Sequence, residues 1–382
     1  MRYISLLCIS LLIFIFSSEV ILNPDVIGAA VNIPDANLES ALRLQLGIPS
    51  DLLTDSDLVS VTHLSVIHTE IANLEGLEHC RNLVHLSLIG VKVKDIRPIK
   101  KLTNLHWLDL GNNQVSDIRP IAALTNLRWL DLNNNQIRDI ESLAGLINLE
   151  RLDLNNNQIR DIQPLAELIH LERLYLNNNQ IHDIYPLTEL IHLESLDLPK
   201  NQIHDIRALG ELTNLKWLYL GENQIDDIRP LAKLKNIERL YLEINQIRDV
   251  SPLAGLKKLF RLNLNENQID DVRPLAESAN LERLELTDNQ ICDVHPLAGL
   301  KNLKWLYLAK NRIHDVNPLA ELVNLYELDL QENRIHDIHP LVKNPGIGQG
   351  DVISVKSNPL NEDSIKHYIH GLKAREVRLS MD

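Results

Sequence analysis

The sequence predicts an α/β solenoid, a coil of short parallel strands joined by tight turns. Two observations predict it. An asparagine recurs every 22 residues, without slip, at eleven positions from Asn113 to Asn333. Before each asparagine, leucines alternate with polar residues, as in a strand with one buried face. Because no single unit can bury its own apolar face, the units are expected to stack and fold as one array.

The repeats are predicted over residues 61–342, as about thirteen units of 22 residues. Leu127–Asn148 reads LRWLDLNNNQIRDIESLAGLIN, and the next unit, Leu149–His170, nearly repeats it. Thr69 and Val91 fill the asparagine column in two degenerate early units. We expect each asparagine to turn inward and bond the backbone where the coil leaves its strand, because buried polar groups need partners.

This register resembles the leucine-rich repeat family, in its bacterial, internalin-like class with 22-residue repeats. The resemblance covers roughly residues 60 to 360. It implies a horseshoe with a parallel concave β-sheet and helical N- and C-terminal caps. It also implies adhesion or cell-surface recognition of a protein partner, although no motif identifies the ligand.

The composition of the 382-residue chain excludes several classes of protein. An apolar content of 45% is enough for a large core and excludes a disordered chain. The formal net charge is −14, so neither nucleic acid nor an anionic membrane is expected as the main partner, because both attract Lys and Arg. Three cysteines are too few for a disulfide scaffold. Cys80 falls in a leucine column and is predicted buried, whereas Cys292 falls in a column of Arg and His and is predicted exposed.

Residues 1–30 are predicted to be a signal peptide. Leu6–Phe16 is almost wholly apolar but too short to span a bilayer comfortably, and a positive charge precedes it. Cleavage after Ala30 or an earlier cut near Ser18 both fit the sequence. No later segment is long and apolar enough to span a membrane. We therefore expect a bacterial protein that is secreted or held at the cell surface, with no membrane span in the mature chain.

Both ends of the array are predicted to be caps, since terminal coils would otherwise expose core. Residues 31–60 form the N-terminal cap, with a helix over Asp35–Leu46. Residues 343–382 form a capping repeat and a helix that begins at Asn361, followed by a last strand near Val377.

A second motif, D-[IV]-x-P-L, lies on the opposite side of each coil. Its aspartate recurs in twelve consecutive units from Asp95 to Asp337, and proline follows three residues later except at Ser142 and Ala208. We expect a turn in which Asp accepts from free N–H groups and proline fixes φ, rather than an acidic metal rail. Histidines that precede four of these aspartates lack a third fixed ligand, so no metal site is predicted. They are His182, His204, His314 and His336.

The chain carries no motif of a known catalytic centre. Gly346, Gly348 and Gly350 precede a strand instead of linking a strand to a helix, so they are predicted to form a cap loop and not a nucleotide-binding loop. There is no nucleophile elbow, metalloprotease helix or Walker loop. We predict a protein that is not an enzyme and that uses no cofactor.

The aromatic residues point to a binding face. The third and fifth positions of L-x-x-L-x-L face away from the core, and they hold eight of the twelve aromatics that follow Ala30. Folding alone would bury such rings, and Trp, Tyr and Arg dominate interface hot spots. Arginines share the third-position column, and aspartates such as Asp197 lie beside them. The candidate binding residues are Trp107, Trp129, Arg151, Arg173, Tyr175, Trp217, Tyr219, Arg239, Tyr241, Trp305 and Tyr307.

Other interpretations of these columns stay open at this point. The rings could stack only on neighbouring coils and be copied by duplication, as LKWLYL is at Leu215 and Leu303. The favoured function is an exported, non-catalytic module that binds a protein. One alternative is a carbohydrate or cell-envelope binder, with Trp stacking on sugar rings. Another is a regulatory subunit of an enzyme such as a phosphatase, which the signal-like N-terminus disfavours.

Overall fold

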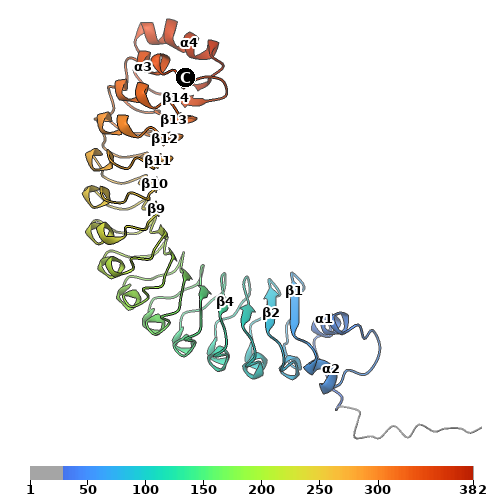
Figure 1. The fold of residues 1–382 in the computed structure, drawn as a ribbon. Helices are drawn as coiled ribbons and strands as arrows, with labels where there is room; N and C mark the ends of the chain where they lie inside the picture. Colours follow the sequence, from blue (N-terminus) through green and yellow to red (C-terminus); the bar gives the residue numbers. More distant parts are fainter. Residues whose placement is uncertain (1–28, 382) are drawn as a thin grey trace, which may run out of the picture.

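The computed structural model describes residues 29–381 and has the architecture of a horseshoe. Fifteen strands form one sheet, in which each strand pairs in parallel with the next strand along the chain. Figure 1 shows the strands on the inner edge of the arc and the short helices on its outer edge. The predicted α/β solenoid with a concave parallel sheet is therefore confirmed. Residues 1–28 of the predicted signal peptide, with the early cut near Ser18, lie outside the described residues.

The strands are short, and most have three residues. They are β1 (His63–Ile67), β2 (His85–Ile89), β3 (Trp107–Asp109), β4 (Trp129–Asp131), β5 (Arg151–Asp153), β6 (Arg173–Tyr175), β7 (Ser195–Asp197), β8 (Trp217–Tyr219), β9 (Arg239–Tyr241), β10 (Arg261–Asn263), β11 (Arg283–Glu285), β12 (Trp305–Tyr307), β13 (Glu327–Asp329), β14 (Val352–Ser354) and β15 (Arg378–Ser380).

The outer edge consists mainly of 3₁₀ helices of three to five residues, a length typical of this tight helix. They are η2 (Leu77–His79), η3 (Arg97–Lys101), η4 (Arg119–Ala123), η5 (Glu141–Leu143), η6 (Gln163–Leu165), η7 (Tyr185–Leu187), η8 (Arg207–Glu211), η9 (Arg229–Lys233), η10 (Ser251–Leu253), η11 (Arg273–Leu275), η12 (His295–Gly299) and η13 (Asn317–Glu321). The α-helices are α1 (Ala36–Leu46), α2 (Asp55–Val59), α3 (His339–Lys343) and α4 (Ile369–Ala374), and a π-helical turn, η14 (Ser364–Tyr368), precedes α4.

Strand pairing keeps the 22-residue offset of the sequence. Leu130 of β4 pairs with Leu152 of β5, and the same offset holds from β1 to β13. From β3 to β13 the central leucine of each strand is buried and lies above the equivalent leucine of the next coil, so the core is a continuous ladder. Cys80 is buried in this core and Cys292 is exposed, as predicted.

The asparagine column forms the predicted inward ladder. Asn135 shows the pattern: its Nδ2 donates to the backbone O of Leu110 at 2.9 Å and of Leu132 at 3.1 Å. Its Oδ1 accepts from the backbone N of Val115 at 2.9 Å. One side chain therefore joins its own coil to the preceding one and satisfies backbone groups that would otherwise be buried without partners.

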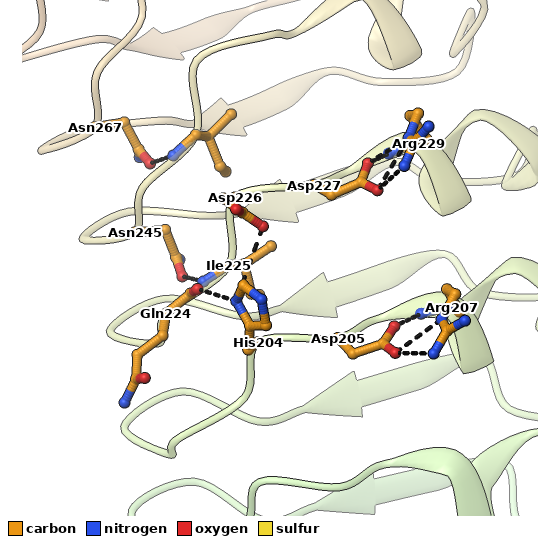
Figure 2. A network of polar contacts seen from close by, with 11 residues as sticks. His204, Asp205, Arg207, Gln224, Ile225, Asp226, Asp227, Arg229, Asn245 and Asn267 are labelled. Carbon is orange, nitrogen blue, oxygen red and sulfur yellow. Dashed lines mark hydrogen bonds and ion pairs between the residues drawn. The ribbon is translucent and has the colours of Figure 1, made fainter.

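The aspartates of the second motif form turns, and the metal-rail alternative is not needed. All twelve accept a hydrogen bond from the backbone N–H two residues later, which begins the outer helix. Figure 2 shows two of them, Asp205 and Asp227, each also paired with the side chain of an arginine. Because these carboxylates hold the turns of each coil, much of the chain's negative charge has a structural role.

Both ends have the predicted helices. At the N-terminus, Asp35 Oδ1 accepts from the N–H groups of Asn37 at 3.0 Å and Leu38 at 3.1 Å. Helix α1 ends at Leu46 and is capped by Gly47, which has a φ of 70°. At the C-terminus, Asn361 Oδ1 accepts from Ser364 N at 2.8 Å at the start of the last helical segment. Strand β15 closes the sheet where the last strand was predicted.

Candidate functional site

The eleven candidate residues all lie on the concave sheet, in the two rows that flank the buried central leucines. The opening residue of each strand forms one row, and the closing residue forms the other. Trp107, Trp129, Arg151, Arg173, Trp217, Arg239 and Trp305 open strands, and Tyr175, Tyr219, Tyr241 and Tyr307 close them. We call these rows the opening row and the closing row. All eleven side chains remain at least partly exposed, and Trp107 is 36% exposed.

At the N-terminal end, the opening row is a continuous stack of rings, which we call the aromatic ladder: His63, His85, Trp107 and Trp129. Ring centroids of successive members are 5.9, 5.2 and 3.5 Å apart. Arg151 extends the stack, with its guanidinium carbon 5.5 Å from the Trp129 centroid and 4.8 Å from that of Tyr175. The faces of both tryptophan rings are therefore covered by neighbours, and their edges face outward.

The middle of the sheet carries a second cluster, which we call the central patch: Trp217, Tyr219, Arg239 and Tyr241. The rings of Tyr219 and Tyr241 stack with centroids 4.9 Å apart. The guanidinium of Arg239 lies 5.8 Å from the Trp217 centroid. Burial raises the pKa of Tyr219, and a hydrogen bond from Arg239 offsets part of that rise.

A third cluster lies on β11 and β12. Arg283 is 4.9 Å from the Tyr307 ring and 2.6 Å from Glu285 Oε1. Trp305 packs edge-on against Tyr326, with centroids 6.5 Å apart. Burial raises the pKa of Tyr307 to about 12. All the candidate residues except Arg173 therefore fall in three clusters, and over residues 29–381 no ring contact joins one cluster to the next.

Strand β7 separates the first cluster from the central patch. It has Ser195 in the opening row and Asp197 in the closing row, where its neighbours have large side chains. Ser195 is only 2% exposed, so the flanking side chains close over it. Asp197 stays partly exposed between Tyr175 and Tyr219, its partners in register.

Carboxylates in the closing row are strongly affected by burial. Burial raises the pKa values of Asp109, Asp153 and Asp197 to about 6. A hydrogen bond from the backbone two residues on partly counteracts the rise at Asp109, from Gly111 N at 2.9 Å, and at Asp153. Asp197 has no such bond.

Polar atoms without partners concentrate on this face. Six buried side-chain N or O atoms of residues 29–381 lack a hydrogen bond, and all but Ser278 Oγ lie on the concave face between β5 and the coil of β9. They are Arg151 Nε, Asp197 Oδ1, Trp217 Nε1, Arg239 Nε and Glu243 Oε2. Unpaired buried polar groups cost stability. The side chains in this stretch of the sheet therefore contribute less to the stability of the fold than those elsewhere. We take this stretch as the candidate site.

Sequence reasoning missed four residues in or near these clusters. His63 and His85 extend the aromatic ladder, and a stacking column of mixed ring types would have revealed them. Glu243 folds over the neighbouring coil, where a side chain in place of Gly221 would meet it. Ile244 is 41% exposed and has a φ of 54°, which is unfavourable for a β-branched residue. Each departs from the commonest residue of its column.

The hollows of the surface are shallow. One of about 520 Å³ runs beside the aromatic ladder and is lined by Trp107, Trp129, Arg128 and Glu150 among others. Another, of about 620 Å³, lies on the side of the aspartate turns, where His204 Nδ1 is 3.0 Å from Gln224 O and 3.8 Å from Asp226 (Figure 2). The backbone contact with Gln224 raises the pKa of His204.

Neither a metal site nor a membrane span is found in the part of the chain that the structure describes. Over residues 29–381, no three His, Cys, Asp or Glu side chains are grouped as metal ligands would be. In the same range, every helix is too short or too polar to cross a bilayer.

Comparison with known proteins identifies the family. The family model described as "Leucine Rich repeats (2 copies)" matches residues 103–141, 125–167, 169–211, 213–255 and 301–343. The structure of internalin InlF from Listeria monocytogenes is 36% identical, with a TM-score of 0.81, and the match covers 82% of this chain and 94% of that one. The chain therefore belongs to the leucine-rich repeat family. Its similarity to InlF places it in the bacterial, internalin-like class.

Two further structures share the fold. A leucine-rich repeat protein of Leptospira interrogans is 27% identical, with a TM-score of 0.75, over 82% of this chain and 81% of that one. The Arabidopsis receptor kinase HAESA, solved in complex with the peptide hormone IDA and the co-receptor SERK1, is 23% identical, with a TM-score of 0.66, over 81% of this chain and 56% of that one. No curated protein sequence matches the chain. Proteins of the internalin-like class are generally binding modules, often secreted or at the cell surface, and no catalytic family is indicated.

Proposed function

We propose that this protein is an exported, non-catalytic binding module that recognises a protein partner through its concave face, in adhesion or cell-surface recognition. The observation that carries the proposal is the central patch. Trp217, Tyr219, Arg239 and Tyr241 gather on a solvent-facing sheet, beside buried polar atoms that have no partner. Rigid rings and arginines at the centre of a surface are the residue types that dominate binding energy.

The geometry of the rings supports a protein partner over a carbohydrate. A sugar stacks on the open face of an aromatic ring, but both faces of Trp107 lie against neighbouring rings. Trp129 has Trp107 on one side and Arg151 on the other. Ring edges and guanidinium groups are left to contact a partner, and these suit peptide groups and side chains.

Export is part of the proposal, and the N-terminal cap bears on where the chain is cut. Ala30 forms an antiparallel bridge with Thr54, and the backbone O of Ala29 accepts from Asp55 N at 3.0 Å. A cut after Ala30 would remove Ala29 from this pairing, whereas a cut near Ser18 leaves it intact. We therefore favour the earlier cut, with residues 31–60 and 343–382 serving as the two caps.

A binding experiment with matched variants tests the function. Surface proteins of plausible partner cells are captured on the purified protein, in parallel with a glycan array, and the affinity of the captured partner is then measured. Trp217→Ala is expected to weaken binding by about 2 kcal/mol or more, roughly 30-fold. Arg229→Ala and Lys233→Ala, on the outer edge, are expected to change it little, because their ion pairs are exposed.

Stability measurements on the same variants make the result interpretable. Trp217 is only partly exposed, so Trp217→Phe, which keeps most of the packing, accompanies the alanine variant. A selective loss of affinity with a nearly unchanged melting temperature supports the concave site. If the outer-edge variants abolish binding while the Trp217 variants do not, the partner binds the other face and the proposal is wrong.

A further inference from the structure

The closing row changes its chemistry at β7. From β6 to β8 it reads Tyr175, Asp197 and Tyr219, paired in register. The two tyrosines are two strand spacings apart, roughly 10 Å, with the carboxylate between them. In the opening row at the same level, Ser195 is closed over by its neighbours. The approach to β7 from the concave side is therefore through the closing row, at Asp197.

The carboxylate of Asp197 lacks the internal hydrogen bond that its equivalents have. In β4, Asp131 Oδ1 accepts from the backbone N of Asn133 at 2.9 Å, and in β5 Asp153 Oδ1 accepts from Asn155 N at 3.0 Å. In β7 the residue two positions on is Pro199, which has no N–H. Asp197 Oδ1 is accordingly buried without a partner.

The charge of Asp197 is also not balanced by a cation. Within residues 29–381 no Lys, Arg or His lies within 4.0 Å of its carboxylate oxygens to form an ion pair. Burial raises its pKa to about 6, and its charge adds to the repulsion felt by Asp153 and Glu243. A cation brought by a partner would relieve both the desolvation and this repulsion.

We propose that the row Tyr175, Asp197 and Tyr219 binds a lysine side chain of the protein partner, with its ammonium on Asp197 and its stem along the tyrosine rings. This inference rests on the proposed function and names the chemistry of the partner at that site. The chain is acidic overall, with a net charge of −14, and a lysine-bearing surface complements it.

The geometry favours lysine over arginine. A guanidinium binds a carboxylate best through two parallel bonds to both oxygens. Here Oδ1 is buried, which leaves a single-point contact on the exposed side of the carboxylate. A compact ammonium makes such a contact, and its apolar stem packs on ring faces or edges without further polar partners.

Small-molecule probes test the site without the identity of the partner. The chain has four tryptophans, so its indole N–H groups give four NMR signals, and that of Trp217 reports on the neighbouring strand. The probes are the blocked amino acids N-acetyl-lysine methylamide, its side-chain-acetylated form, and N-acetyl-arginine methylamide. The lysine probe is expected to shift the Trp217 signal saturably, with about tenfold higher affinity than its neutral form.

Two variants remove the site in different ways. Asp197→Asn removes the charge with little change of shape, and Pro199→Asn supplies a backbone N–H that can bond Asp197 as Asn133 bonds Asp131. Both are expected to weaken lysine binding about tenfold. Both should keep or raise the melting temperature, because the first removes the buried charge and the second gives it a hydrogen bond. The matched control is Asp131→Asn, in the same row but internally bonded, which should leave lysine binding unchanged.

Each outcome decides the proposal. It is overturned if the lysine probe gives no saturable shift of the Trp217 signal, if the neutral or arginine probe binds as well, or if Asp197→Asn has no effect. These failures differ from a failure of the proposed function. A captured protein partner that depends on Trp217 but not on Asp197 would leave the concave binding face standing and remove only the lysine site.

Discussion

The side chain of Asn201 accepts a hydrogen bond from the backbone N–H of Ile181, in the preceding coil, at 3.0 Å. The same side chain donates to Leu176 O and Leu198 O, each at 3.0 Å, and to Pro199 O at 3.1 Å. One residue thereby satisfies four backbone groups in two coils, so the coils cannot separate without exposing them.

Replacing Asn201 is therefore expected to be costly. Asn201→Leu should lower the free energy of unfolding by about 3 kcal/mol, since several buried backbone groups lose their partners at once. Asn214→Ala, which removes one exposed bond to Ile191 O, should cost about 1 kcal/mol or less. Chemical denaturation of both variants measures the difference. Equal small losses at Asn201 and Asn214 would contradict the role given to the ladder.

Ile244 is expected to be a site where substitution stabilises the fold. Its φ of 54° is a left-handed conformation that β-branched residues rarely adopt, and asparagine occupies the equivalent position in four coils. Ile244→Asn should raise the free energy of unfolding by about 1 kcal/mol. The reverse change, Asn134→Ile, should lower it by a similar amount. Thermal melts of the pair check both signs, and a destabilised Ile244→Asn would show that apolar contacts outweigh the strain.

The stability of the protein is expected to depend on pH through the closing row. The folded-state pKa values of Asp109, Asp153 and Asp197 are about 6, above their ordinary value of 3.8. The folded state therefore binds protons more tightly than the unfolded state in this range. The resulting stabilisation is fully present below about pH 4 and is lost as the pH rises through 6.

As the pH is lowered from about 7 to about 5, the free energy of unfolding should accordingly rise by roughly 1 kcal/mol per group. The melting temperature should rise with it. Below that range the turn carboxylates oppose the gain, because the hydrogen bonds that Asp117 accepts from Arg119 hold the pKa of Asp117 at about 2. Asp153→Asn should raise the melting temperature at neutral pH and flatten the profile. A profile that falls steadily from pH 7 to 5 would contradict the assignment.

If the protein is exported as proposed, its mature N-terminus is expected near Ser18. Mass spectrometry of the exported chain measures it directly. A chain that begins at Val31 should melt at a lower temperature than one that begins before Ala29, because it lacks the bond from Asp55 N to Ala29 O. An exported chain found to begin at Val31 would contradict the proposed cut.

The repeated coils of this fold could be predicted from the sequence, because the repeated residues differ in polarity from their neighbours in the chain. An asparagine in an apolar register, such as Asn201, has to bond the backbone, and its column revealed the ladder. A second ladder was missed. Asn148 donates to Thr125 O at 3.0 Å, and seven equivalents do the same, but these asparagines are exposed and show no such contrast.

The candidate site could be predicted only in outline. The opening and closing rows followed from the strand period, so the positions of Trp217 and Tyr241 were foreseeable. Which rings stack is set by rotamers, and sequence spacing does not specify those. The Asp197 carboxylate lacks a hydrogen bond because Pro199, two residues later and outside the strand, has no backbone N–H. Neither residue alone indicated an unpaired carboxylate.

The constant 22-residue offset between strands also fixes the spacing of side chains along the concave face. The coils bond only to their neighbours, so the separation of any two anchor side chains along the arc is a whole number of strand spacings of about 4.8 Å. Duplication or loss of one coil between β9 and β11 would leave the central patch and the Arg283–Tyr307 pair intact. It would change the distance between these two sites by one strand spacing. A rigid partner that contacts both sites would then be able to contact only one site at a time.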